Sequence, residues 1–294
     1  MAIIDDIRRR YLQGTILLRI IYINVAVFLL LTATLLIAFL LGWDAQVVLK
    51  WIELPSQPHE LLHKPWTLIT YMYAHHDVWH ILFNMLWLYW LGRIFTEYFT
   101  EKQLNGLYLL GGLGGGALYL IAYNMLPAFS GTHGYLVGAS AAVMAIVVGI
   151  AIWAPNYKIS LLFLGDISLK WVAIITVFID MLNFETLNAG GHLAHLGGAL
   201  VGAFFALSMR RGVDITRWLN ATLDAAASLF RPRRRGPGTP IGGTAWRKQT
   251  QAPHPHPTEA EVDAVLDKIK RSGYGSLTAS EREILFNASR TPNN

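Results

Sequence analysis

The sequence predicts an all-α membrane protein with six membrane-spanning helices and a small helical tail. The chain has 294 residues, of which 53% are hydrophobic and only 15% charged, whereas an ordinary soluble domain has roughly 25% charged residues. The mean hydropathy over the whole chain is positive, at +0.38. Several apolar stretches reach the roughly 20 residues that a helix needs to cross the hydrocarbon core of a bilayer.

The predicted spans follow one another in the first two thirds of the chain. The first, residues 15–41, is longer than the core of a cleaved signal peptide, so we expect it to be retained. A connection rich in tryptophan and proline follows, and we expect it to be a partly embedded loop. The other five spans are predicted at residues 78–96, 104–125, 135–153, 169–184 and 191–209.

Lysine and arginine set the predicted orientation, because cytoplasmic loops of membrane proteins carry an excess of both. With a cytoplasmic N-terminus, the outside segments hold only Lys50 and Lys64. The inside segments then hold Arg8, Arg9, Arg10, Arg93, Lys102, Lys158, Lys170, Arg210 and Arg211. We therefore expect both termini in the cytoplasm, with an even number of spans.

Polar residues on three spans are predicted to share one depth. The even-numbered spans all enter from the outside, so their first residues lie near the outer face. His80 and Asn84 belong to the second span, Ser140 to the fourth, and His192 and His195 to the sixth. At 1.5 Å per residue they lie roughly 5–10 Å below the outer surface. Because polar side chains in membrane helices face the bundle interior or a water-filled cavity, we expect these residues to converge.

The residue types indicate nucleophilic acyl transfer. The chain has no cysteine, which excludes disulfides, thiolate nucleophiles and cysteine metal ligands. Acyl transfer needs a hydroxyl, a base and donors for the developing oxyanion. Ser140 can supply the hydroxyl and His195 the base. The backbone N–H groups at the start of the fourth span, with His80 and Asn84, can supply the donors.

These motifs resemble those of the rhomboid family of intramembrane serine proteases. HILFN (80–84) is similar to the family's H-x-x-x-N on the second span, and GAS (138–140) to its G-x-S around the nucleophile. AHLGGALVG (194–202) is similar to its A-H-x-x-G-x-x-x-G around the histidine. PWTLITYMYAHHDVWH (65–80) resembles the family's approach to the second span. The similarity covers about residues 15–210.

The resemblance implies a serine endopeptidase that cleaves single-span transmembrane proteins near the outer membrane face. It implies a Ser140–His195 dyad without a catalytic aspartate, and His80 and Asn84 as oxyanion-stabilising residues. It implies no cofactor, metal or nucleic acid, so the partners are the substrate and the lipid bilayer, here expected to be a bacterial inner membrane. Asp180, near the outer end of the fifth span, is expected to be a solvated or helix-bonded carboxylate.

The chain departs from the family pattern at three positions. Ala141 follows the serine where the family usually has glycine, and we expect its methyl group to narrow the space around the acyl group. Met144 stands where an aromatic ring often packs on the histidine. Thr67 stands where an arginine often follows the tryptophan of the first loop. None of the three removes a reacting group.

Two other functions remain open. One is a catalytically inactive, rhomboid-like scaffold that binds membrane clients, although both the serine and the histidine are present. The other is a metal or haem protein, since neutral imidazole is a common ligand; against it, the glutamate of H-E-x-x-H is missing and no carboxylate is expected nearby in the helices. If the protein is not a metal or haem protein, we expect His192 to have a structural or loop-contacting role. The candidate ligands are His75, His76, His80, His192 and His195.

The C-terminal region is predicted to be separate from the membrane helices. Thr278 and Glu281 form a capping-box pattern at the start of a second tail helix, and docking of a cytoplasmic protein partner is the expected role. The predicted domains are a cytoplasmic N-terminus (1–14), a six-helix protease domain (15–210), a basic Pro- and Gly-rich linker (211–257) and a helical hairpin (258–294).

Overall fold

The structure is a computed structural model that describes residues 14–161, 165–182, 188–229 and 258–288. The chain divides into two compact units, Met1–Pro232 and Arg233–Asn294. Each unit is described by itself below.

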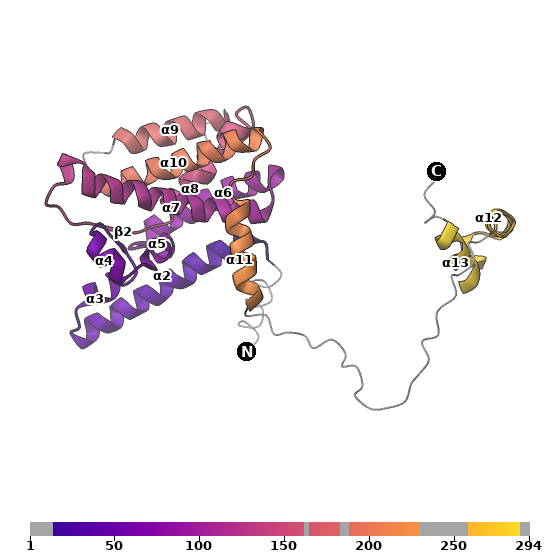
Figure 1. The fold of residues 1–294 in the computed structure, drawn as a ribbon, viewed down its shortest axis with the longest axis horizontal. Helices are drawn as coiled ribbons and strands as arrows, with labels where there is room; N and C mark the ends of the chain where they lie inside the picture. Colours follow the sequence, from indigo (N-terminus) through magenta and orange to yellow (C-terminus); the bar gives the residue numbers. More distant parts are fainter. Residues whose placement is uncertain (1–13, 162–164, 183–187, 230–257, 289–294) are drawn as a thin grey trace. The chain divides into compact units, whose positions relative to one another are not determined.

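The first unit is a helical bundle (Figure 1). α7, α8 and α10 pack against one another at its centre, with α6 against α8. α2 lies on one side against α6 and α7, and α9 on the opposite side against α8 and α10. The helices are α2 (Ile16–Leu41), α6 (Val78–Tyr98), α7 (Glu101–Met125), α8 (Ser140–Trp153), α9 (Leu169–Leu182) and α10 (Ala189–Arg210).

A helix is present at each predicted span, but the count of six membrane crossings stays a prediction. Among the described residues, three helices are long and apolar enough to cross a bilayer: α2, α7 and α10. α8 and α9 have 14 residues each. α8 starts later than predicted because residues 135–136 form a strand instead of its first turn.

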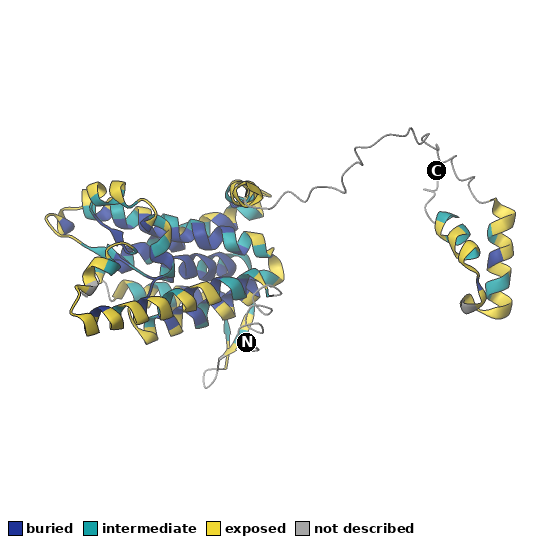
Figure 2. Ribbon diagram, turned by 90° about the horizontal axis from the view of Figure 1, so that it is seen from below, coloured by how far each residue is buried: buried dark blue, intermediate teal, exposed yellow. Residues whose placement is uncertain are grey.

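Residues on the outer faces of the bundle are exposed (Figure 2), and many of them are large apolar side chains. Large side chains on α2 point outward, among them Phe39, which is 79% exposed. α9 likewise exposes Phe178 and Leu182. Such an outer surface suits contact with lipid tails, which are as apolar as the side chains themselves.

Glycines let α8 and α10 pack backbone against backbone. A Cβ atom at Gly198 would overlap the carbonyl oxygen of Ala141, and one at Gly202 would overlap that of Ala145. Because no other residue lacks a Cβ, this close approach depends on glycine at both positions. It brings the first turn of α8 beside the second and third turns of α10.

The connection between α2 and α6 reaches the segment that precedes α8. β1 (Leu54–Pro55) pairs antiparallel with β2 (Tyr135–Leu136). The rest of the connection consists of α3 (Ala45–Leu49), α4 (Pro58–His63), α5 (Thr67–Thr70) and the 3₁₀ turn η1 (Tyr71–Tyr73), while η2 (Pro127–Phe129) follows α7. A second hairpin, β3 (Lys158–Leu161) and β4 (Gly165–Ser168), joins α8 to α9.

Part of the segment predicted to be a linker is helical. α11 spans Arg217–Leu229 and packs against α7. Its sequence, RWLNATLDAAASL, is rich in alanine and leucine, which are strong helix formers. The Lys102 ammonium of α7 lies 2.6 Å from the Asp224 carboxylate, and the Gln103 amide donates to Asp214 at 2.9 Å. The prediction of a linker is therefore wrong for residues 217–229. Alanine and leucine favour a helix there, despite the arginines and prolines that follow.

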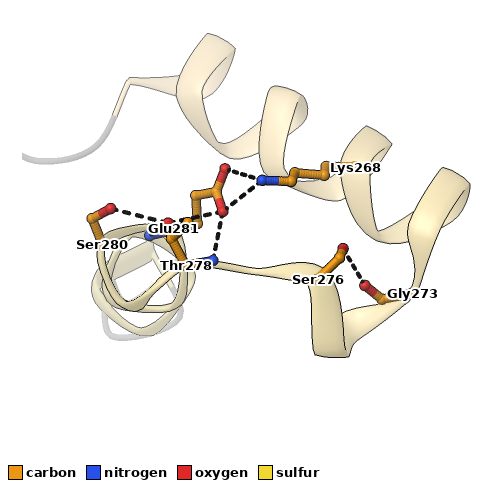
Figure 3. A network of polar contacts seen from close by, with 6 residues as sticks. All are labelled: Lys268, Gly273, Ser276, Thr278, Ser280 and Glu281. Carbon is orange, nitrogen blue, oxygen red and sulfur yellow. Dashed lines mark hydrogen bonds and ion pairs between the residues drawn. The ribbon is translucent and has the colours of Figure 1, made fainter.

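In its described part, residues 258–288, the second unit has the helices α12 (Glu259–Ser272) and α13 (Ala279–Ala288), with the 3₁₀ turn η3 (Tyr274–Ser276) between them. The Lys268 ammonium donates to both carboxylate oxygens of Glu281, at 2.8 and 3.0 Å (Figure 3). The Thr278 N–H donates to Glu281 at 2.7 Å, and the Glu281 N–H donates back to the Thr278 hydroxyl at 3.4 Å. The predicted capping box is confirmed.

Candidate active site

Ser140 and His195 are hydrogen bonded across the α8–α10 interface. Ser140 is the first residue of α8, and His195 lies in the second turn of α10. The distance from Ser140 Oγ to His195 Nε2 is 2.6 Å. Because Gly198 lies one turn beyond His195 against the backbone of Ala141, the glycine contact fixes the separation of these two side chains.

Asp180 completes a chain of hydrogen bonds behind His195. Its Oδ1 lies 2.6 Å from His195 Nδ1 and 2.8 Å from His192 Nδ1. A carboxylate at Nδ1 holds the proton on that nitrogen, so Nε2 of His195 is left as the acceptor for the Ser140 hydroxyl. The side chains of His192, His195 and Asp180 are 12–17% exposed.

The expectation that Asp180 is a solvated or helix-bonded carboxylate is therefore wrong. The expectation that no carboxylate lies near the histidines is wrong for the same reason. α9 packs against α10, and Asp180 in its last turn lies within hydrogen-bonding distance of His192 and His195. The position of a residue along its span predicts its depth in the membrane, but not whether its face of the helix is turned toward the bundle interior.

The segment before Ser140 is held by the α2–α6 connection. Gly138 has φ +120°, a conformation that favours glycine, and its N–H donates to the Tyr71 carbonyl at 2.9 Å. The Ala139 N–H donates to Nε2 of the buried His75 at 3.4 Å. Burial, with the nearby His80, lowers the pKa of His75 to about 3, so its imidazole is neutral and accepts this bond. This contact fixes the backbone from which Ser140 projects.

His80 and Asn84 lie on the other side of Ser140. The His80 ring packs against Gly138: a Cβ there would lie 2.7 Å from Nε2 of the imidazole. The Asn84 amide donates to the His80 carbonyl at 2.8 Å, a bond within α6. The Asp77 carboxylate caps α6 by accepting the His80 N–H at 2.8 Å.

Two cavities meet at Ser140. The larger, of about 360 Å³, brings together all four predicted site residues. It is lined by Trp79, His80, Phe83, Asn84, Val137, Ser140, Asn188, Gly191 and His195. The smaller, of about 130 Å³, extends from Ser140 along α8 and is lined by Phe83, Asn84, Trp87, Ser140, Val143, Met144, Val147 and Thr176.

The three departures from the family pattern have local explanations. Ala141 is buried and its methyl group points at Gly115 of α7, where a second Cβ would be only 2.5 Å away. Its methyl group therefore packs against α7, and its effect on the space around the acyl group stays a prediction. Met144 lines the smaller cavity. The buried Thr67 donates its hydroxyl to the Lys64 carbonyl at 2.7 Å.

The five histidines proposed as metal ligands do not form one cluster. The His76 ring lies 2.5 Å from Glu53, and this hydrogen bond raises the pKa of His76. His75 and His80 pack edge to face, with ring centroids 4.9 Å apart. In the described part of the chain, the group with ligand atoms close enough to share a metal is His192, His195 and Asp180.

Two site residues were not assigned from the sequence. Asp180 carried a signal, since a carboxylate inside an apolar helix is a functional candidate by default. Asn188 lines the larger cavity, and its side chain caps α10 by accepting the Gly191 N–H at 3.2 Å. It lies in a connection without helical periodicity, so nothing in its spacing pointed to the site.

Two models of known protein families match separate parts of the chain. Residues 62–212, just over half of the 294, match the model of the Rhomboid domain. The chain belongs to the rhomboid family. Residues 256–291 match a second model, DUF6576, a family of unknown function.

Three curated relatives illustrate the range of the rhomboid family. RHOMBOID-like protein 12, mitochondrial, of Arabidopsis thaliana is 33% identical over 157 residues, covering 50% of this chain and 47% of the relative. Rhomboid protease GlpG of Yersinia pseudotuberculosis is 26% identical over 195 residues, covering 66% and 62%. Presenilin-associated rhomboid-like protein A, mitochondrial, of Danio rerio is 27% identical over 139 residues, covering 45% and 34%. The chain thus matches less than two thirds of the length of each.

This rhomboid is a membrane protein. Two of the three relatives are mitochondrial by name, so the expectation of a bacterial inner membrane is not supported by them.

Proposed function

We propose that this rhomboid is an intramembrane serine endopeptidase that hydrolyses peptide bonds of single-span transmembrane proteins. The observation that carries the proposal is the 2.6 Å contact between Ser140 Oγ and His195 Nε2. A hydroxyl and a base at hydrogen-bonding distance, with the base oriented by a third group, is the arrangement that activates a serine nucleophile.

In the proposed reaction, Ser140 Oγ attacks the scissile carbonyl while His195 Nε2 takes its proton. His195 then gives this proton to the leaving amine, and the acyl-enzyme is hydrolysed by water that His195 activates in the same way. Asp180 accepts the Nδ1–H bond throughout, which keeps Nε2 free to accept and stabilises the imidazolium that forms. Asp180 is therefore a positioning residue in addition to the expected pair.

The oxyanion is proposed to bind at the start of α8. The first N–H groups of a helix have no acceptor within the helix, so the Ser140 N–H can face the developing charge. His80 and Asn84 line the same cavity as Ser140 and offer further donors. Asn84 already donates one N–H to the His80 carbonyl, which orients its amide and leaves the second N–H for the oxyanion.

The position of Ser140 fits a substrate that enters from the membrane. α8 has 14 residues, about 21 Å at 1.5 Å per residue, so it is shorter than the hydrocarbon core of about 30 Å. A serine at its first residue therefore lies below the membrane surface, while the 360 Å³ cavity above it can admit water. We propose the outer face for this opening, both termini in the cytoplasm, and docking of a cytoplasmic protein as the role of the tail.

Single substitutions at five positions test the proposal. Ser140→Ala and His195→Ala should each abolish cleavage of a transmembrane substrate, together with labelling by a serine-directed fluorophosphonate. His192→Ala should keep a substantial part of the activity, because His192 does not touch Ser140. Asn84→Ala should fall between them, since loss of one oxyanion donor costs about 10²–10³ in rate and the other donors share the charge. His80→Ala should behave like Asn84→Ala.

Thermal melts of each variant in detergent control for folding. If the wild-type protein were folded but neither cleaved the substrate nor reacted with the probe, the result would favour the alternative function, a catalytically inactive scaffold. If His195→Ala were active and His192→Ala inactive, the base would be assigned to the wrong histidine.

A further inference from the structure

His195 of the reacting pair and two further side chains, Asp180 and His192, point metal-binding atoms at one another. His192 and His195 are three residues apart on α10, and both turn Nδ1 toward Asp180 on α9. One ligand atom from each of the three side chains lies within 4.8 Å of the other two. The imidazole rings are perpendicular, with centroids 5.9 Å apart. Both Nδ1 atoms face the same atom, Oδ1 of Asp180.

From this geometry we infer that Asp180, His192 and His195 form an inhibitory site for a divalent transition-metal ion of the zinc type. Two imidazoles and one carboxylate are a ligand set that zinc accepts, with a fourth position for water. In a tetrahedral site the ligand atoms lie about 3.3 Å apart, given zinc–nitrogen and zinc–oxygen distances of about 2.0–2.2 Å. The present nitrogen–oxygen separations of 2.6 and 2.8 Å need to open by about 0.5–0.7 Å.

The site is reachable from water. The three side chains are 12–17% exposed, and His195 also lines the 360 Å³ cavity at Ser140. The carboxylate supplies a negative charge, and the imidazoles need not lose a proton, since each can move its single proton from Nδ1 to Nε2. A bound ion therefore replaces two hydrogen bonds by three coordinate bonds.

Inhibition follows from the tautomer that metal binding imposes, and this part of the inference rests on the proposed protease function. With Asp180 at Nδ1, the His195 proton lies on Nδ1 and Nε2 accepts the Ser140 hydroxyl. With a metal at Nδ1, the proton must lie on Nε2, the atom that faces Ser140 Oγ. His195 then cannot take the serine proton, although its ring has hardly moved.

The test is zinc inhibition of the purified full-length protein in detergent, after chelator treatment, at buffered free zinc concentrations. Wild-type protein should be inhibited reversibly, with activity restored by a chelator. His192→Ala should need at least about tenfold more zinc relative to its own zinc-free rate, since even loss of an outer-shell contact costs 10–100-fold in metal affinity. His63→Ala is the matched control, because His59 and His63 form another exposed histidine pair on one helix. Its zinc sensitivity should equal that of wild type.

Cobalt(II) gives a readout that does not depend on cleavage. Wild-type protein should develop the visible absorption of tetrahedral cobalt, and His192→Ala should not. Equal zinc inhibition of wild type and His192→Ala, or wild-type protein that cleaves but ignores zinc, would overturn the inference and leave the protease function standing. Folded wild-type protein that does not cleave would contradict the protease function, and the cobalt spectrum would still decide the metal site.

Discussion

At the scale of single residues, Asp180 is the side chain that joins His192 and His195 in one hydrogen-bond network. Both hydrogen bonds that it accepts end on the same oxygen, Oδ1. An asparagine at this position can therefore present its own Oδ1 to both histidines and preserve the tautomer of His195. Only the negative charge would be lost.

This distinction gives a prediction for two substitutions at Asp180. Asp180→Asn should lower kcat about 10- to 100-fold with little change in KM, less than the roughly 10⁴-fold loss in a triad where asparagine imposes the wrong tautomer. Asp180→Ala should lower kcat further, because nothing then orients His195. Rates on a transmembrane substrate measure both. Equal, wild-type rates for the two variants would show that His195 needs no support from Asp180.

At the scale of secondary-structure elements, the site depends on how closely α8 and α10 approach each other. Gly198 and Gly202 touch the carbonyl groups of Ala141 and Ala145, so the two helices cannot separate without moving Ser140 away from His195. Packing of small residues is the main source of helix association in a bilayer, where burial of apolar surface gives no advantage over lipid. Stability and catalytic geometry therefore rest on the same contact.

Gly198→Ala should reduce both stability and activity. The added methyl group overlaps a backbone oxygen that cannot rotate away, and overpacking of this kind costs about 1–3 kcal/mol. Gly149→Ala on α8 is the control in the same helix contact. Its Cβ would meet the flexible end of Leu107 at 3.3 Å and the Gly202 carbonyl oxygen at 3.4 Å, an ordinary contact distance. A thermal melt and a cleavage assay on each variant compare the two. Equal melting temperatures and rates for both variants would contradict the role of the close approach.

At the scale of the whole molecule, the membrane unit and the tail are separate compact units divided near Pro232. All residues of the candidate site belong to the first unit. The second has its own ion pair and capping box, which link α12 to α13. Catalysis and tail function should therefore be separable.

Truncation after about residue 230 should preserve cleavage in detergent, because the contacts of Ser140, His195 and Asp180 within the described residues all lie before residue 230. The comparison is between full-length and truncated protein on one substrate, with folding followed by a thermal melt. A truncated protein that is folded but inactive would show that the tail belongs to the catalytic unit.

Reporter fusions test the proposed orientation. A fusion after residue 210 should be active only with a reporter that works in the cytoplasm, because Arg210 and Arg211 follow the last span and arginines favour that side. Activity only on the outer side would overturn the layout and the depth argument built on it.

The sequence by itself determined the class of the protein, the positions of its main helices and the pairing of Ser140 with His195. These follow from local patterns. The length of each apolar stretch predicts a helix, and the order of the motifs along the chain predicts which polar residues lie near the starts of the helices. The start of α8, the helix α11 and the inward face of α9 were decided by tertiary structure. The strand pairing of β1 with β2 replaces the first turn expected for α8, and α7 gives α11 a surface to pack on. Asp180 reaches His192 and His195 only because α9 is rotated to face α10, and a rotation about a helix axis is set by packing with neighbours, which no spacing within one helix records.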